Sequence, residues 1–317
     1  MKPQLKAVFI LLAVALVCGA SYPTVRWAVA IMDPIAFSSI KFLMSAAVLL
    51  PFALRKPGPL PKKFWGKPPG RFFWLWAGLF AGLLLALETV FLYVGMVSTA
   101  SGKAAFIANM NVLVVPLIAI AIGRMPGRPI WLGLVLGVVG VWLLSSPTDD
   151  EAGALNIGDA LVFGCACFRG LHIVMNGRFA NRVNLYRFVT AQLVVTGLAC
   201  GIVTLVRGTL PSAEAFWLTL PSSLFGIFSV SFAIMAQTAA QRSVRATEAS
   251  LTLLLEAVFA AIIGVIFLNE VMTAVMWLGA VMMVAGAAMG QIHEERGGER
   301  RANPAPAAGK SETAKRP

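Results

Sequence analysis

The chain has 317 residues, of which 58% are hydrophobic and 13% are charged, and its mean hydropathy is +0.81. These values exclude an ordinary soluble domain and predict an all-α polytopic membrane protein. The net charge of +12 would suit a nucleic-acid-binding protein. However, the basic residues gather in short segments between apolar runs, so no nucleic-acid partner is expected.

Apolar runs, taken in chain order, predict ten transmembrane helices. We expect these helices at residues 7–26, 34–54, 72–95, 101–122, 129–145, 157–176, 187–206, 216–240, 247–268 and 272–290. The first run resembles a cleaved signal peptide, but many similar runs follow it, and we expect it to be retained as the first helix. The cysteines lie inside apolar runs without the spacing of metal ligands, and we expect no metal or other cofactor.

The two halves of the chain resemble each other. The offset that carries Gly133 onto Gly279 also carries the preceding Trp-Leu pair onto an identical pair, and it carries Gly140 onto Gly286. A shared bias towards apolar residues does not produce such an ordered block, and we interpret it as an internal duplication.

The duplication divides the chain into a first five-helix repeat at 1–147, a second at 148–290 and a polar tail at 291–317. The tail can bury no core, and we expect it to be disordered. Because five is an odd number of spans, the two repeats must cross the bilayer in opposite directions, as an inverted repeat. The basic residues fall in alternate loops, which predicts an inner (cytoplasmic) membrane protein with both termini and the tail in the cytoplasm.

Three stretches of the chain carry a resemblance to a known family. They are TASGKAAFIANMNVLVVPL at 99–117, FRGLHIVMNGRFA at 168–180 and QTAAQRSVRATEASLTLLLEAVFAAIIGVIFLNE at 237–270. In this order, and with the duplication, the chain resembles EamA-type transporters of the drug/metabolite transporter superfamily everywhere except in the tail. The resemblance implies ten helices in two inverted halves around a central cavity. It also implies transport of small organic solutes such as amino acids or other metabolites, often outward.

The sequence departs from that family's pattern at three positions. Arg124 replaces the glutamate usual at the end of the fourth helix, and Ala257 replaces a proline that commonly follows the mid-membrane glutamate of the ninth. Both changes concern helix ends and kinking. Arg169 stands where an aromatic residue is usual, and it adds a charge that bears on the class of substrate.

Glu256 is the leading candidate for a functional residue. A helix that begins near Thr247 places Glu256 roughly 15 Å from its start, at the bilayer midplane, because the rise is about 1.5 Å per residue. An ionised side chain there costs on the order of 2.5–3.5 kcal/mol, which favours a substrate or proton site. The alternative is a protonated carboxyl group hydrogen-bonded between helices. Met110 occupies the equivalent place in the first repeat, so the halves are not chemically equivalent.

Further polar side chains fall inside the predicted helices. Glu88 lies in the third helix and is a candidate partner of Lys103, which alternatively extends to the membrane surface. Arg169 and His172 are three residues apart and share a face of the sixth helix, where they either bind an anionic group or Arg169 neutralises Glu256 or Glu88. The remaining candidates are amides that either line the cavity or join helices. They are Asn109, Asn111, Gln192, Gln237 and Gln241.

The function predicted from these features is secondary transport, with export of small polar organic metabolites such as amino acids. A rival from another class is an integral membrane enzyme acting on lipids or prenyl chains. Such an enzyme would need a cluster of nucleophile, base or metal ligands, but the histidines are only His172 and His293 and no HExxH motif is present. A scaffold without transport would not need polar residues at the midplane. We therefore expect a non-enzymatic protein whose partners are a small-molecule substrate and the lipid bilayer, as a monomer or homodimer.

Overall fold

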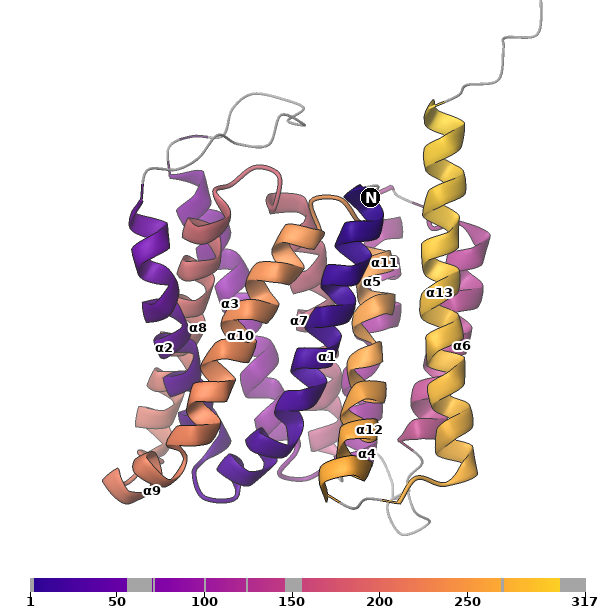
Figure 1. Cartoon of the computed structure of the whole chain (residues 1–317). Helices are drawn as coiled ribbons and strands as arrows, with labels where there is room; N and C mark the ends of the chain where they lie inside the picture. The colour runs from indigo at the N-terminus through magenta and orange to yellow at the C-terminus, as the bar shows by residue number, and fades with distance from the viewer. Residues whose placement is uncertain are drawn as a thin grey trace, which may run out of the picture.

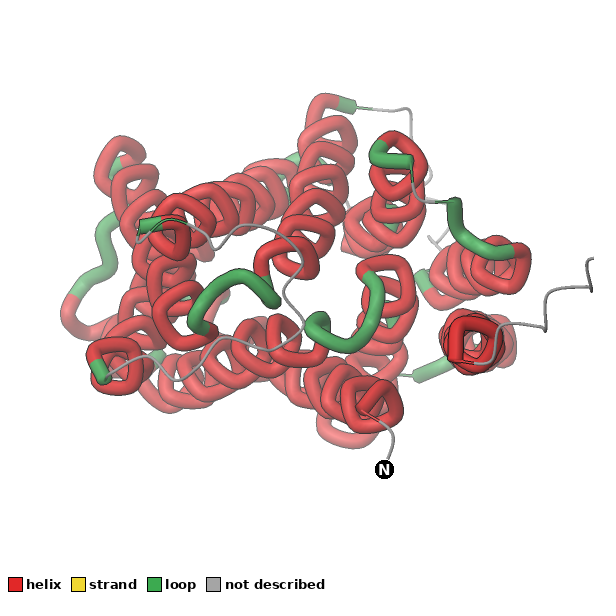
Figure 2. The backbone as a smooth tube through the Cα atoms, turned by 90° about the horizontal axis from the view of Figure 1, so that it is seen from above, coloured by secondary structure: helices red, strands yellow, loops and turns green. Residues whose placement is uncertain are grey.

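The structure is a computed structural model that describes residues 3–55, 70, 72–99, 101–123, 125–145, 156–268 and 271–302. All regular secondary structure in these ranges is helical. The helices are α1 (Pro3–Val29), α2 (Pro34–Leu54), α3 (Phe73–Gly95), α4 (Ser101–Asn109), α5 (Asn111–Ala121), α6 (Arg128–Leu144), α7 (Ile157–Phe179), α8 (Leu185–Arg207), α9 (Ala213–Leu218), α10 (Leu220–Ala240), α11 (Ala246–Leu253), α12 (Leu255–Leu268) and α13 (Ala274–Ala302). The helices stand side by side, and the start of α1 and the end of α13 lie at the same end of the bundle (Figures 1 and 2).

The described part of the chain contains nine segments long and apolar enough to cross a membrane, together with α6, a shorter apolar helix. They coincide with the predicted spans, so the prediction of an all-α polytopic membrane protein is confirmed. Several boundaries differ by a few residues; the eighth span, for example, was expected from residue 216 but α10 begins at Leu220. Pro221 lies at the start of α10, where a missing backbone N–H costs nothing. The residues before it form the short helix α9.

The main helix–helix contacts join one half of the chain to the other. In these contacts α1 packs on α10 and α12, α2 on α8, α3 on α7 and α8, and α6 on α13. Contacts between α1 and α2 or between α2 and α3 are few by comparison. The two repeats of the sequence therefore share one interior and are not separate folding domains.

The crossing of α6 with α13 shows how the halves are related. A methyl group built on Gly133 would lie 2.7 Å from the carbonyl oxygen of Gly286, and one on Gly140 would lie 2.6 Å from that of Gly279. The internal duplication matches Gly133 with Gly279 and Gly140 with Gly286. The two glycines of α6 therefore contact the equivalent two glycines of α13, with the order exchanged. Because the order along α13 is reversed relative to α6, the equivalent helices run antiparallel. The predicted inverted repeat is confirmed by this geometry.

A second crossing of equivalent helices joins α2 to α8. Ser39 Oγ donates a hydrogen bond to the carbonyl oxygen of Gly197 at 2.9 Å. Both helices also start alike, with the side chains of Asp33 and Asn184 accepting hydrogen bonds from backbone N–H groups of the first turn. The pseudo-twofold relation thus extends across the bundle.

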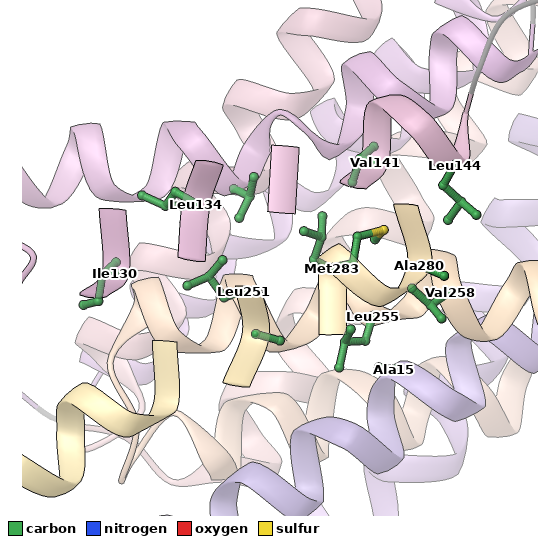
Figure 3. Close-up of a cluster of buried hydrophobic side chains, with 13 residues drawn as sticks. Ala15, Ile130, Leu134, Val141, Leu144, Leu251, Leu255, Val258, Ala280 and Met283 are labelled. Atoms are coloured by element: carbon green, nitrogen blue, oxygen red, sulfur yellow. The ribbon is translucent and has the colours of Figure 1, made fainter. Parts of the chain in front are cut away.

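A cluster of buried apolar side chains lies beside the α6–α13 crossing (Figure 3). It brings together Ile130 and Leu134 of α6, Leu251 of α11, Met283 of α13 and Ala15 of α1. The residues come from both halves, so burial of this cluster requires the whole chain.

Two of the predicted spans are interrupted near their middle. α4 ends at Asn109 and α5 begins at Asn111, while α11 ends at Leu253 and α12 begins at Leu255. The two interruptions lie at nearly equivalent places in the repeats, in the same pair of helices. Pro116 lies inside α5, six residues after the irregular turn at Met110.

The last helix is longer than the sequence predicted. α13 continues to Ala302, so the helix extends past residue 290 into the segment that the sequence analysis assigned to the tail. Residues 291–302 contain three glutamates and three arginines, which favour helix, beside Gly297 and Gly298, which do not, and they extend an existing helix without a new nucleation step. Residues 303–317 lie outside the described residues, as do Arg124 and the basic loop at 56–69.

Candidate functional site

Three charged side chains meet in the interior of the bundle, and we call them the charged triad: Glu88 of α3, Arg169 of α7 and Glu256 of α12. Arg169 Nη2 donates a hydrogen bond to Glu256 Oε2 at 3.0 Å, and Arg169 Nε lies 3.7 Å from Glu88 Oε1. The sequence left open which carboxylate Arg169 neutralises, and the structure shows that it contacts both. With all groups ionised, the triad has one more carboxylate than guanidinium.

The depth of the triad follows from helix geometry. At about 1.5 Å per residue, Arg169 lies on the order of 18 Å from the start of α7, and Glu256 lies at a similar distance from the end of α12. Both are therefore close to the middle of a hydrocarbon core of about 30 Å. Glu88 lies roughly 10 Å from the end of α3, nearer one membrane surface.

The triad is not sealed from small molecules. The side chain of Arg169 is 29% exposed, that of Glu256 is 20% exposed and that of Glu88 is 15% exposed. Glu88 Oε2 is nevertheless buried and accepts no hydrogen bond from any residue that the structure describes. A polar solute that reached the triad would find an acceptor without a donor.

The neighbouring helix α1 lies close against the triad. A methyl group on Gly19 would lie 3.0 Å from the carbonyl oxygen of Glu256, so the backbones of α1 and α12 are in direct contact there. A further charged side chain within an apolar helix is that of Lys41 of α2, whose Nζ lies 5.5 Å from the ring centroids of Phe37 and Phe42. Lys41 of α2 was not identified in the sequence analysis. Its signal was the one used for Glu256, a single charged residue inside an apolar run.

Lys103 does not pair with Glu88 as the sequence suggested. Its Nζ lies 2.7 Å from Asp159 Oδ2, in the first turn of α7. Asp159 also accepts a hydrogen bond from Thr99 Oγ1 at 3.0 Å and completes a capping box with Asn156. Lys103 and Asp159 both lie at helix starts at one end of the bundle, whereas Glu88 lies deeper. We therefore place this ion pair outside the triad.

His172 is hydrogen-bonded to amide side chains. Its Nε2 lies 2.9 Å from Gln192 Oε1 of α8 and 3.2 Å from Asn176 Nδ2, and both His172 and Gln192 are buried. The hypothesis that Arg169 and His172 bind one anionic group together therefore gains no support from the geometry. His172 and Gln192 join α7 to α8.

The two asparagines beside Met110 act within their own helix span. Asn109 Nδ2 donates to the carbonyl oxygen of Ala105 at 2.8 Å, and Asn111 Nδ2 donates to that of Ala108 at 3.1 Å. These bonds satisfy carbonyl groups next to the interruption between α4 and α5. Neither asparagine joins two spans through these bonds.

The two remaining amides lie near the end of α10. Gln241 Nε2 donates to the backbone carbonyl of Ile173 at 3.0 Å and so ties the end of α10 to α7. Gln237 is buried one turn earlier. Among the residues that the structure describes, no group of three or more His, Cys, Asp and Glu side chains could hold a metal ion.

Comparison with known proteins identifies relatives of the chain. The model of the EamA-like transporter family matches twice, at residues 5–146 and 156–289. A protein of Archaeoglobus fulgidus described as an uncharacterized transporter is 26% identical over 276 residues, which is 86% of this chain and 81% of that protein. A crystal structure of a protein that is 16% identical superimposes with a TM-score of 0.72, over 92% of this chain and 98% of that one. This last likeness concerns the fold alone.

Proposed function

The chain belongs to the EamA-like transporter family, and from this premise we propose that it is a secondary transporter exporting small polar organic metabolites such as amino acids. That it is a multi-pass membrane transporter follows from the family and from the apolar helices. The substrate class and the outward direction are the proposed part. The direction rests on the family resemblance of the sequence.

The proposed substrate class, small polar metabolites, is supported mainly by the charged triad. Its residues come from both halves of the chain, at the depth where transporters built from inverted repeats bind their substrates. Ionised groups near the midplane are costly and usually face a partner or a polar pathway. Because Glu88 and Glu256 share one Arg169, an ammonium group on the substrate would supply the missing positive charge and a donor for Glu88 Oε2.

Two irregular turns lie in the helix spans near the triad. At each of them one residue, Met110 or Leu254, breaks the regular helical hydrogen-bond pattern while its backbone stays right-handed helical. The interruption between α11 and α12 lies directly before Glu256, and its counterpart lies between α4 and α5. A change of angle between α11 and α12 would move Glu256 relative to Glu88 and Arg169.

We further propose that the protein lies in the cytoplasmic membrane as a monomer or homodimer, with both termini in the cytoplasm. The start of α1 and the end of α13 lie at the same end of the bundle. Arg182, Arg187 and Arg242 belong to loops or helix starts on that side in the predicted topology, in accord with the positive-inside rule.

Untargeted measurement of metabolites in the medium of cells that overproduce the chain tests the proposed function. We expect one or a few amino acids or related compounds to accumulate outside these cells, and to do so much less with Glu256→Gln at equal membrane abundance. Glu214→Gln is the matched control, because it makes the same change on the short helix α9, away from the triad. A medium identical to that of cells without the chain would contradict the proposal.

A further inference from the structure

Two arginines belong to one cluster of side chains where α2 ends and α8 begins. Arg187 Nε donates a hydrogen bond to the carbonyl oxygen of Ala53 at 3.1 Å, which ties the start of α8 to the end of α2. Arg55 follows α2 directly, and its guanidinium carbon lies 5.1 Å from the ring centroid of Phe52. Phe52 in turn stacks on Tyr186, with 5.7 Å between the ring centroids. We call this group the arginine cluster.

The arginine cluster is bordered by side chains of the kind that lie at a membrane surface. The guanidinium carbon of Arg187 lies 5.9 Å from the ring centroid of Trp74, at the start of α3. Leu54 ends α2 and Trp76 lies in the first turn of α3, and both are exposed. Tryptophan and tyrosine gather at the boundary between the hydrocarbon core and the lipid headgroups. A lipid against this cluster would have its chains beside exposed apolar side chains and its headgroup beside the arginines.

The two positive charges of the cluster have no counter-ion among the residues that the structure describes. No carboxylate in these ranges is within ion-pair distance of Arg55 or Arg187. The terminal nitrogens of Arg187 donate no hydrogen bond within the same ranges, since only its Nε is engaged. Glu294, Glu295 and Glu299 belong to α13, which stands on the far side of the bundle from α2 (Figure 1).

The equivalent place at the other end of the bundle is neutralised. There α8 ends at Arg207, whose Nη1 lies 3.5 Å from Oδ2 of Asp33, the residue that caps α2. At the arginine cluster the corresponding cap of α8 is Asn184, an uncharged residue that accepts the same kind of hydrogen bond. The fold therefore accepts a carboxylate at this capping position, and the arginine cluster lacks one. A positive charge left open at one end alone points to an anionic ligand.

We propose that Arg55 and Arg187 bind the phosphate group of an anionic phospholipid in the cytoplasmic leaflet. The guanidinium fork suits phosphate, because it can donate two parallel hydrogen bonds to its oxygens. Two arginines also favour a headgroup of net negative charge over one whose phosphate is balanced by its own ammonium group. The leaflet follows from the proposed orientation of the chain. The cluster lies at helix ends and the charged triad lies deeper, so this lipid is distinct from the transported substrate.

Native mass spectrometry of the purified full-length protein in a neutral detergent tests this assignment. The probes are dioleoyl phosphatidylglycerol and dioleoyl phosphatidylcholine, which differ in net charge and share their chains. We expect phosphatidylglycerol to bind more tightly than phosphatidylcholine. Arg55→Gln should raise the Kd of phosphatidylglycerol by about fivefold, since each arginine near an anionic lipid contributes about 1 kcal/mol. Adding Arg187→Gln should bring the increase to about 25-fold.

Two further variants make the result specific to the cluster. Asn184→Asp supplies the carboxylate that the cluster lacks, and aspartate still caps the helix, so it should weaken phosphatidylglycerol binding about as much as Arg55→Gln. Arg207→Gln is the matched control, because it removes an arginine from the equivalent place at the other end of the bundle. It should leave the Kd unchanged. Melting temperatures without added lipid show whether each variant is folded.

Three results would overturn the lipid site. They are equal affinity of the wild-type protein for the two lipids, wild-type affinity for phosphatidylglycerol in both Arg55→Gln and Asn184→Asp, and displacement of the lipid by an equal concentration of inorganic phosphate. The last result would make the cluster a site for free phosphate. Because the measurement uses no transported substrate, failure of the proposed function would leave the lipid site standing, and failure of the lipid site would leave the proposed function standing.

Discussion

Arg169 contacts two carboxylates from two different helices, and this sharing determines what each partner contributes. The hydrogen bond to Glu256 is short, whereas the approach to Glu88 is longer than a hydrogen bond. Glu256 is therefore the principal counter-ion of Arg169. Glu88 is the carboxylate more readily available to a substrate.

Removal of the charge of Glu256 should separate transport from folding. Glu256→Gln keeps the size of the side chain and an oxygen that can accept from Arg169, but it removes the negative charge. We expect substrate flux in vesicles to fall by about tenfold or more, as a loss of 1.4 kcal/mol or more in substrate binding implies. The melting temperature in detergent should change little. Normal flux in this variant would exclude Glu256 from the substrate site.

Removal of Arg169 should act on folding instead. Arg169→Met leaves Glu88 and Glu256 near each other without a counter-ion, and an uncompensated charge in the interior is strongly destabilising. We expect a lower melting temperature and less protein in the membrane. Adding Glu256→Gln to Arg169→Met should restore part of the loss, and the double-mutant cycle measures the coupling. Strictly additive effects would argue against the ion pair.

The sequence identified the triad residues but not all of their contacts. Depth and helical spacing selected Glu88, Arg169 and Glu256, because charged residues in apolar runs are rare and conspicuous. Which distant helix each side chain faces depends on packing between the halves, and sequence spacing carries no such information. For this reason the sequence offers Glu88 as a candidate partner of Lys103 but not Asp159, with which Lys103 pairs.

At the scale of helices, glycines at matched positions set the distance between α6 and α13. The sequence matched these glycines through the duplication, and the structure adds that they meet each other across the pseudo-twofold axis. The interruptions of two spans were not predicted. A continuous apolar run fits a straight or a broken helix equally well. The asparagines beside Met110, whose side chains donate hydrogen bonds to backbone carbonyl groups of the same span, are the one feature of the sequence that marks this place.

The α6–α13 crossing should tolerate no added methyl group. Gly140→Ala would place its methyl 2.6 Å from the backbone oxygen of Gly279, and backbone cannot move aside as a side chain can. We expect a destabilisation of about 1–3 kcal/mol, the usual cost of overpacking. The pseudo-twofold relation predicts a similar cost for Gly279→Ala.

Melting temperature in detergent measures both changes. Gly70→Ala is the control, because nothing lies within 4 Å of a methyl group built at that position. A Gly140→Ala protein that melts with the wild type would show that the helices can separate there at no cost.

At the scale of the whole molecule, the orientation in the membrane can be tested at two exposed positions. In a variant without native cysteines, Leu210→Cys lies beyond the end of α8 and Ser243→Cys lies between α10 and α11. We expect an impermeant thiol reagent to label Leu210→Cys in intact cells and Ser243→Cys only after permeabilisation, because the positive-inside rule places the latter in the cytoplasm. The reverse pattern would invert the orientation.

The predominance of contacts between the halves has a consequence for how the protein is made. The first five spans leave the ribosome before most of their packing partners exist, because α1, α2, α3 and α6 bury their faces mainly on helices of the second half. During that interval lipid chains must cover those faces, including the glycines of α6 and the charged groups at Lys41 and Glu88. A nascent chain paused after α6 is therefore an inserted but unassembled protein, exposed to membrane proteases and chaperones until α13 is in place.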